Sequence, residues 1–365
     1  MREMTRKPER VLLLLMAFTC LVFGIDAGLL RLGWIVLFPT ADFQAYHGAL
    51  MVCGFLGTLI SLERVVAAGN FWAFLGPLCS ATGGLTLILG AHWMLSGALI
   101  TFASAILVFV SGVIFFRQSA LYTITLQLGS VCWLVGNLLW LGGLSLAQVA
   151  PWWIGFLVLT IAGERLELSR LMRPTRLAST PFVIIVGMFL AGASLVSMLH
   201  PLGTFMMSIA LLGLTLWLFR FDVARRTIYQ QGLTRYIAVC LLSGYVWLLA
   251  ASLVGLSSMH WLSGIGALYD AVLHAIFVGF VFSMIFGHVP IILPAITRIR
   301  IPYHPFLYLP LLILHASLAI RISGDLLSLP DQRSVGGALN ALAIVMFVLA
   351  VVGMLIYGKK LRKAS

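Results

Sequence analysis

Apolar residues run through this chain in long uninterrupted blocks, and polar residues gather in short connections between them. A helix needs about 20 mostly apolar residues to cross the roughly 30 Å hydrocarbon core of a bilayer, because it rises about 1.5 Å per residue. Blocks of this length lie at about residues 11–38, 44–66, 71–91, 97–116, 121–144, 151–166, 181–199, 202–220, 234–257, 270–296, 304–323 and 335–357. The pattern predicts an all-α polytopic membrane protein with about twelve transmembrane helices.

The composition excludes a large water-soluble domain. Of the 365 residues, 61% are apolar and only 9% are charged, whereas roughly a quarter of an average soluble protein is charged. The connections between the apolar blocks are short, and none has the composition of a disordered linker. A single transmembrane domain over residues 1–365 is therefore the simplest prediction.

The charge is strongly basic, with 23 Lys and Arg against 11 Asp and Glu and a formal net charge of +12. Binding to nucleic acid would require cations clustered on a soluble face, but here they lie between apolar blocks. Lys and Arg concentrate in cytoplasmic loops of membrane proteins, so their positions predict the topology. With both termini in the cytoplasm, all but three of the 23 cations fall on the inner side, and the exceptions are Arg31, Arg321 and Arg333.

Ionisable side chains within a membrane are costly and are candidates for function. His47 lies about one turn into the second span and is followed by Gly48, Gly54 and Gly57. These glycines would leave a smooth surface beside the imidazole, against which a flat macrocycle or a neighbouring helix could lie. His47 is therefore either a metal ligand or a hydrogen-bonded histidine within small-residue helix packing.

His274 lies in the tenth span, which crosses the membrane in the same direction as the second span, so we expect His274 and His47 at similar depth. Asp270 precedes His274 by four residues, on the same helix face. Its carboxylate could accept the other ring N–H and orient the imidazole as a metal ligand, although a simple surface Asp–His pair would have the same spacing. Two imidazoles at matched depth on different helices are what axial ligation of a buried haem requires.

Two further histidines are candidate ligands of a second metal or haem. His288 lies fourteen residues beyond His274, about 21 Å further along the helix, and is followed by Pro290 and Pro294. These prolines remove backbone donors and are expected to kink or end the helix. His315 lies near the middle of the eleventh span.

Two glutamates end spans beside arginines, as Glu63-Arg64 and Glu164-Arg165. We expect these clusters at the inner face, where they either neutralise one another and fix the helix ends or form part of a proton path. The five cysteines all fall within spans and contain no CxxC or CxxCH, so neither a disulfide framework nor covalent haem attachment is indicated.

Three stretches carry a resemblance to the NnrS family of haem- and copper-containing membrane proteins, which are linked to nitric oxide metabolism and are divergent relatives of the haem-copper oxidase catalytic subunit. The stretches are Leu273-His274-Ala275 followed by Gly279 and Gly287-His288, then Ala162-Gly163-Glu164-Arg165, then His47-Gly48 with Met51. The resemblance covers most of the chain in layout and about fifty residues in motif.

The resemblance implies a bundle like that of the haem-copper oxidase subunit I, located in the bacterial inner (cytoplasmic) membrane. It implies a b-type haem near the outer face held by His47 and His274, with copper as a second metal. It also implies a role in the nitric oxide response or in membrane electron transfer, with nitric oxide or another small gas as a ligand. A redox subunit or a cytochrome would be the protein partner, besides the lipid bilayer itself, and no nucleic acid is expected.

The chain departs from the family pattern at the metal sites. Residues 151–199 contain no histidine, and His274 stands alone where the oxidases have a His-x-His. The O₂-reducing centre of the oxidases therefore cannot be assembled. His47 is also single where the NnrS family has a His-x-His-Glu, so copper is less supported than haem. A softer copper site would use Met51 or Cys53.

Two alternative functions remain open. Twelve spans also suit a secondary transporter built from two six-helix halves, although the loop after the second span, Glu63-Arg64-Val65-Val66-Ala67-Ala68-Gly69-Asn70, does not match the charged motif of the major facilitators. The other alternative is a non-enzymatic haem-bearing subunit of a redox complex. The sequence assigns no catalytic residue and does not decide whether the protein is an enzyme.

Overall fold

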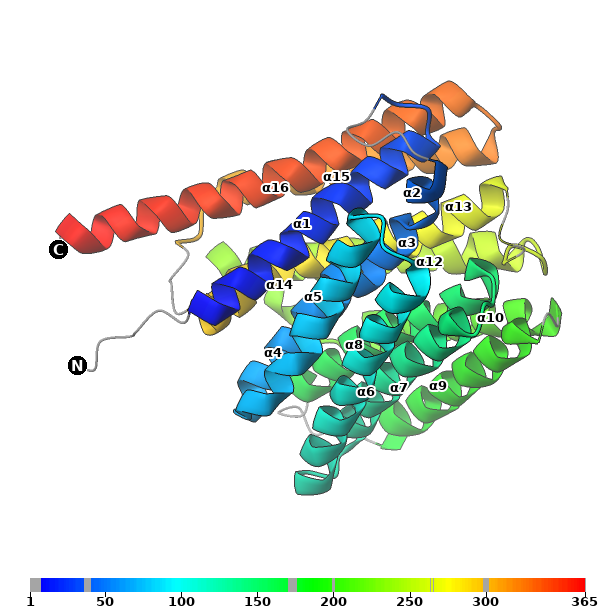
Figure 1. The fold of residues 1–365 in the computed structure, drawn as a ribbon, viewed down its shortest axis with the longest axis horizontal. Coiled ribbons are helices and arrows are strands. Elements are labelled where there is room, and N and C mark those ends of the chain that lie inside the picture. Colours follow the sequence, from blue (N-terminus) through cyan, green and yellow to red (C-terminus); the bar gives the residue numbers. More distant parts are fainter. Residues whose placement is uncertain are drawn as a thin grey trace. The chain divides into compact units, whose positions relative to one another are not determined.

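The computed structural model describes residues 8–35, 41–169, 176–198, 201–262, 264, 266–297 and 302–364. Within these ranges the backbone is helical between short turns, and no described residue lies in a strand (Figure 1). Twelve helical runs are long and apolar enough to cross a membrane. The prediction of an all-α polytopic membrane protein with twelve spans is therefore confirmed.

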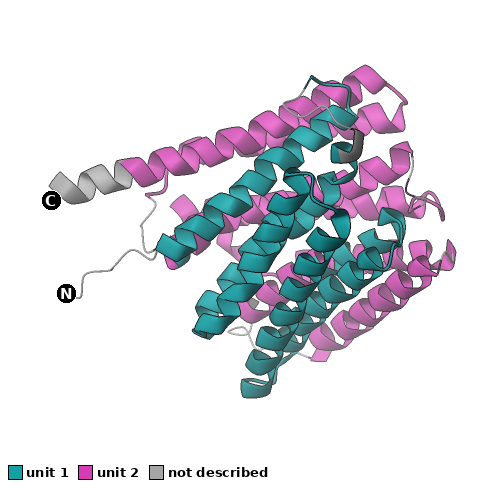
Figure 2. Cartoon of the chain, in the orientation of Figure 1, with its two compact units in different colours: residues 1–156, 296–298 teal, residues 157–295, 299–365 magenta. Residues whose placement is uncertain are grey.

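The chain divides into two compact units (Figure 2). Unit 1 comprises residues 1–156 and 296–298, and it contains the first five spans and the start of the sixth. Its elements are α1 (Pro8–Arg31), α2 (Ala41–Ala45), α3 (His47–Ala49), η1 (Leu50–Gly57), α4 (Thr58–Ala68), η2 (Phe71–Phe74), α5 (Leu75–Ile88), α6 (Trp93–Arg117), α7 (Leu121–Leu141) and the first part of α8 (Leu146–Ser169).

Unit 2 comprises residues 157–295 and 299–365. It holds the remainder of α8 and the helices that follow. These are α9 (Arg176–Ser197), α10 (Pro201–Phe221), α11 (Ala224–Thr227), α12 (Gly232–Leu256), α13 (Ala267–His274), η4 (Ala275–Phe282), α14 (Ser283–Thr297), η5 (Pro305–Leu307), α15 (Tyr308–Leu326) and α16 (Pro330–Ala364). The last two residues of α14, Ile296 and Thr297, belong to unit 1.

Small residues allow the helices of unit 1 to approach closely. A Cβ atom built on Gly54 of η1 would lie 3.0 Å from Cys20 of α1 and 3.4 Å from the Cα of Gly84 in α5. Hydrophobic association does not drive helices together inside lipid, so close backbone approach at small residues is a main source of stability there. The second span is consequently held on two sides by its neighbours.

Unit 2 uses the same device between its last two long helices. A Cβ on Gly324 of α15 would lie 2.5 Å from the backbone nitrogen of Arg333, and one on Gly336 of α16 would lie 2.5 Å from that of Arg321. The two glycines therefore bring the backbones of α15 and α16 together at the level of these arginines. Asn340 of α16 adds a hydrogen bond to Ser317 Oγ at 2.6 Å.

Burial distinguishes three spans from the rest. In the apolar core of the second, sixth and tenth spans, 67%, 83% and 61% of the residues are buried. When the spans are taken in order as three groups of four, each of these spans has the largest buried share in its group. The second and tenth carry His47 and His274. Apolar side chains on other spans, such as Leu15 and Leu312, are more than half exposed, as expected for helix faces that meet lipid.

The first span is shorter than predicted. Helix α1 ends at Arg31, and the chain turns at Gly33, whose φ of +83° favours glycine. The amides of Gly33 and Trp34 donate to the carbonyls of Leu30 and Leu29 at 3.1 Å, which satisfies the end of the helix. Hydropathy extended the span to residue 38 because the residues after the turn are also apolar. Arg31 is thus the last residue of α1 rather than an internal one.

The prolines of the tenth span do not end it. Both Pro290 and Pro294 lie inside α14, which continues to Thr297. Each proline removes one donor, and membrane helices tolerate this where other groups satisfy the released carbonyls. Within unit 1, Arg10 Nη1 donates to the carbonyl of Ile296 at 3.2 Å, close to the end of this helix.

Two segments adopt the rare π-helix, in which backbone hydrogen bonds join residues five apart. They are η1 in the second span and η4 in the tenth, each of eight residues. In both spans the π-helix closely follows a histidine, because α3 begins at His47 and α13 ends at His274. The sequence did not predict this feature.

Several cations used for the predicted topology lie outside the described residues. They are Arg2, Arg6, Lys7, Arg170, Arg173, Arg298 and Arg300.

Candidate functional site

His47 is anchored to the first helix of unit 1. Its Nδ1 lies 2.7 Å from the carbonyl oxygen of Gly24 in α1, and its ring packs against Gly28, where a Cβ atom would lie 2.8 Å from Cε1. The absence of a side chain at Gly28 therefore makes room for the imidazole, and Gly24 contributes its carbonyl oxygen.

The glycines that follow His47 contact side chains of neighbouring elements. A Cβ on Gly48 would lie 3.7 Å from the ring of Trp153, one on Gly54 would meet Cys20, and one on Gly57 would clash with Trp133. These three glycines pack the second span against neighbouring elements. Of the two alternatives predicted for this surface, the structure contains the helix contact.

A carbonyl oxygen cannot donate a hydrogen bond, so the contact with Gly24 requires the proton of His47 on Nδ1. A neutral imidazole in this tautomer carries its lone pair on Nε2, the atom available to a metal. The same arrangement recurs at His274, whose Nδ1 lies 2.8 Å from the backbone oxygen of Asp270. It recurs again at His288, whose Nδ1 lies 2.6 Å from that of Met284.

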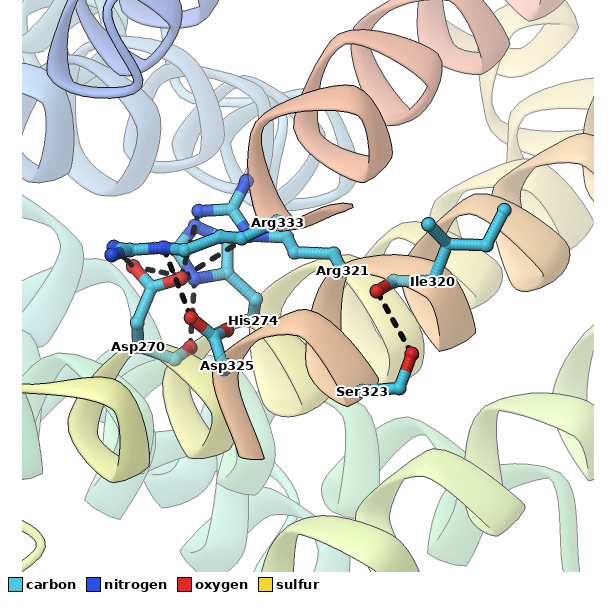
Figure 3. A network of polar contacts seen from close by, with 7 residues as sticks. All are labelled: Asp270, His274, Ile320, Arg321, Ser323, Asp325 and Arg333. Carbon is cyan, nitrogen blue, oxygen red and sulfur yellow. Dashed lines mark hydrogen bonds and ion pairs between the residues drawn. The ribbon is translucent and has the colours of Figure 1, made fainter. Parts of the chain in front are cut away.

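His274 also belongs to a buried charge network in unit 2 (Figure 3). Its Nδ1 lies 3.4 Å from Asp270 Oδ1, so the predicted pair at i and i+4 is formed. The Asp270 carboxylate binds Arg321 through Oδ2, with Nη2 at 2.9 Å and Nε at 3.2 Å. Arg333 Nη2 lies 3.2 Å from Oδ1 of the same carboxylate, and its Nε lies 2.9 Å from Asp325 Oδ1.

This network balances two carboxylates against two guanidinium groups. The side chains of Asp270, Arg321 and Asp325 are at most 10% exposed, whereas Arg333 is 35% exposed. Burying isolated charges is costly unless they are paired and hydrogen-bonded, and here each charge faces an opposite one. The network joins α13, α15 and α16, and Figure 3 shows its side chains converging beside His274.

The sequence predicted Asp270 as a partner of His274 but missed Arg321, Arg333 and Asp325. A signal was present, because Arg321 and Arg333 were two of the three exceptions to the predicted inner-face distribution of cations. A charged side chain among membrane helices is costly and requires a local reason. The reason in this structure is ionic pairing with Asp270 and Asp325.

His288 lies near a second group of charges in unit 2. It is within electrostatic reach of Arg165, Glu164 and Asp222. Arg165 Nε lies 3.8 Å from Asp222 Oδ2, with both side chains buried, and Asp222 Oδ1 accepts a hydrogen bond from the amide of Ala224 at 2.6 Å. Arg165 therefore pairs with Asp222, and the inner-face cluster predicted for Glu164-Arg165 stays a prediction.

Glu63, the other glutamate of the predicted proton path, is half-buried in α4 of unit 1. Nothing in the geometry of unit 1 tests whether it carries protons, so the path through Glu63 and Glu164 stays a prediction. The same holds for the matched depth of His47 and His274, which belong to different units.

His315 differs from the other candidate ligands because both of its ring nitrogens make side-chain hydrogen bonds. Trp247 Nε1 donates to its Nδ1 at 2.9 Å, and its Nε2 lies 2.9 Å from Ser243 Oγ. Since an indole N–H can only donate, His315 carries its proton on Nε2 and donates it to Ser243. Metal ligation by His315 would require one of these bonds to break.

The described residues contain no group of three or more His, Cys, Asp or Glu side chains that could hold a metal ion. Met51 and Cys53, the softer copper candidates, face different neighbours. A Cβ on Gly24 would lie 2.7 Å from Met51 Sδ, whereas Cys53 Sγ donates to Asn137 Oδ1 at 3.5 Å. All five cysteines are free thiols.

Comparison with protein families gives one match along nearly the whole chain. A family described as a domain of unknown function, DUF8744, matches residues 10–356. No curated protein matches the sequence. The chain is a multi-pass membrane protein, with twelve apolar helices among its described residues, and it belongs to the DUF8744 family.

Proposed function

We propose that this chain is a membrane protein that binds b-type haem, with His47 of unit 1 and His274 of unit 2 as haem ligands through Nε2. The observation that carries the proposal is the shared anchoring of both imidazoles, since each holds its Nδ1 within 2.8 Å of a backbone oxygen. Histidines that ligate metals almost always donate the other ring N–H to a carbonyl or a carboxylate, which fixes the tautomer and the ring orientation.

The residues around each histidine would perform different parts of this role. Gly24 and Gly28 hold the His47 ring in one orientation on α1. Asp270 holds the His274 ring by its backbone oxygen and places a carboxylate beside the same N–H. When bound, haem supplies a redox-active iron that accepts electrons and small diatomic ligands.

The likeness of His47-Gly48, Leu273-His274-Ala275 and Gly287-His288 to the NnrS family supports nitric oxide, or another small gas, as the ligand. We propose His288 and His315 as further ligands of a second haem or of copper. Copper has less support, because the described residues form no cluster of three ligating side chains. Electron transfer would require a redox subunit or a cytochrome as partner.

We also propose that the protein lies in the bacterial cytoplasmic membrane with both termini on the cytoplasmic side. The distribution of Lys and Arg along the sequence supports this topology.

The test is the absorption spectrum of the full chain purified in mild detergent after haem-replete expression. We expect a Soret band and a pyridine haemochrome of b type. His47→Gln and His274→Gln should each lower or shift the band, because each removes a nitrogen that would ligate the haem. His274→Met, which offers a thioether as the ligating group, should retain haem with an altered spectrum and so guards against simple misfolding.

His260→Gln is the matched control, since the His260 side chain is exposed at a connection in unit 2, and its spectrum should equal that of the wild type. A wild-type protein without a Soret band would overturn the proposal. Unchanged spectra in both ligand variants would overturn the assignment of these histidines.

A secondary transporter is the second candidate, because charged groups buried among membrane helices mark ion pathways. The pairs Arg321–Asp270 and Arg165–Asp222 are of this kind. Ion-coupled uptake of a solute into vesicles by a haem-free chain, abolished in Asp222→Asn, would establish this function instead.

A further inference from the structure

The two oxygens of the Asp270 carboxylate have different partners. Oδ2 receives both donors from Arg321, at 2.9 and 3.2 Å. Oδ1 lies between Arg333 Nη2 at 3.2 Å and His274 Nδ1 at 3.4 Å. Arg321 therefore holds Oδ2 of the carboxylate, whereas Arg333 competes with the imidazole for Oδ1.

The imidazole N–H in turn has two acceptors. The backbone oxygen of Asp270 is the closer one at 2.8 Å, and the carboxylate Oδ1 is the more distant one at 3.4 Å. A hydrogen bond to an ionised acceptor is about twice as strong as a neutral one. The balance between the two acceptors therefore determines the strength of the hydrogen bond that the Nδ1–H of His274 donates.

The packing of α15 and α16 holds both arginines in place. The backbone of Arg321 lies against Gly336, and the backbone of Arg333 lies against Gly324. Asp325, whose side chain is fully buried, binds Arg333 Nε at 2.9 Å. The position of each guanidinium relative to Asp270 is therefore fixed by the helix pair rather than by a flexible loop.

We propose that Arg321 and Arg333 are positioning residues for His274, which act through the Asp270 carboxylate to set the strength of the hydrogen bond at Nδ1. If His274 ligates a metal through Nε2, the strength of the hydrogen bond at Nδ1 affects how much electron density the imidazole donates to that metal. Only this last step rests on the proposed function. A stronger bond at Nδ1 makes the imidazole a more electron-rich ligand. The arginines weaken that bond by holding the carboxylate and sharing its charge.

The direct test uses the full chain with ¹⁵N-labelled histidine in lipid nanodiscs, with the His274 ring resonances identified by their loss in His274→Gln. Arg333→Gln frees Oδ1 for the imidazole, so the Nδ1 resonance should shift toward a stronger hydrogen bond. Arg321→Gln should shift it the same way by a smaller amount. Asp270→Asn removes the anionic acceptor and should shift it in the opposite direction.

Two variants separate positioning from loss of structure. Arg333→Lys keeps the positive charge but loses the forked geometry, so its shift should lie between those of the wild type and Arg333→Gln. Arg225→Gln removes an exposed arginine of the same unit, which donates to the backbone oxygen of Arg220, and it should leave the His274 resonances unchanged.

The midpoint potential of the haem-loaded chain tests the last step. Arg333→Gln should lower the potential, because it makes the ligand more electron-rich and removes a cation. Asp270→Asn should raise it.

The proposal is overturned if Arg333→Gln and Asp270→Asn leave the Nδ1 resonance unchanged or move it in the same direction. Since the resonance is measured with or without haem, a haem-free wild-type protein would overturn the proposed function alone. If Arg333→Gln and Asp270→Asn shift the resonance in opposite directions but leave the midpoint potential unchanged, only the effect of this hydrogen bond on the metal is overturned.

Discussion

The second span of unit 1 and the tenth span of unit 2 share a backbone design but differ in how they hold a histidine. Each has a histidine that a π-helix of eight residues follows. His47 is bonded to the backbone of another helix, at Gly24. His274 is bonded to the backbone of its own helix and to a carboxylate that two arginines bind.

The difference shows that one orientation of an imidazole can be secured by packing or by charge. A bond to a neighbour's carbonyl depends on the distance between two helices, and so on the glycines that permit it. A bond to a carboxylate depends on the charges that neutralise that carboxylate. The two histidines should therefore respond to different substitutions, and the following predictions use this contrast.

The largest expected effect is on the charge network. Arg321→Met leaves Asp270 with only the partly exposed Arg333 as a cationic partner, and breaking a buried ion pair typically costs about 3–5 kcal/mol. We expect a loss of about 3 kcal/mol in the free energy of unfolding, measured by equilibrium unfolding of the full chain in mixed micelles. The double variant with Asp270→Asn should recover at least half of this loss, because no unpaired charge remains. A loss below about 1 kcal/mol in Arg321→Met alone would contradict the inference that the ion pair with Asp270 stabilises unit 2.

The next effect is on the packing of unit 1. Gly28→Ala places a Cβ atom 2.8 Å from Cε1 and 2.9 Å from Nδ1 of His47, so either the ring or α1 must move. Overpacking of this kind costs about 1–3 kcal/mol. Gly112→Ala is the matched control within unit 1, because its Cβ would make only an ordinary contact with Gln127 at 3.8 Å. It should be neutral or stabilise the helix by up to about 1 kcal/mol, and equal losses in both variants would refute the role of Gly28.

The smallest expected effect concerns the serine hydroxyl groups that donate hydrogen bonds to carbonyl oxygens of the two π-helices. Ser80 Oγ donates to the carbonyl of Cys53 in η1 from another helix at 2.8 Å, whereas Ser283 Oγ donates to Gly279 in η4 from the same span at 2.5 Å. Hydrogen bonds between membrane helices contribute about 0.6 kcal/mol on average and up to about 1.7. Ser80→Ala should therefore cost about 1 kcal/mol and Ser283→Ala less than about 0.5. Hydrogen exchange of the η1 and η4 amides measures both, and the reverse order would count against the comparison.

The sequence predicts the architecture well, because the number of spans follows from the length of the apolar blocks. It predicts the ends less well. Helix α8 begins at Leu146, five residues before the predicted start, and α1 ends at Arg31. Both differences arise because hydropathy identifies apolar segments but not the residues at which a helix begins or ends. Those ends depend on backbone conformation, as in the turn at Gly33.

The candidate site is predictable only where it is local. The spacing of four residues identified Asp270 beside His274, since it follows from helical geometry. The pairing with Arg321 and Arg333 depends on how three helices meet, which no periodicity encodes. The anchoring of His47 by Gly24 escaped prediction for the same reason, and the hydrogen bonds of His315 likewise come from another helix.

The π-helix η1 sets an angular offset between the two ends of its span. Each residue of an α-helix turns the chain by about 100°, whereas a π-helix joins residues five apart and turns the chain by less at each residue. The angle about the helix axis between His47 and the residues of α4 therefore differs from the angle that an unbroken α-helix of the same length would give. The direction in which this imidazole points is therefore encoded by the length of a segment that does not include it.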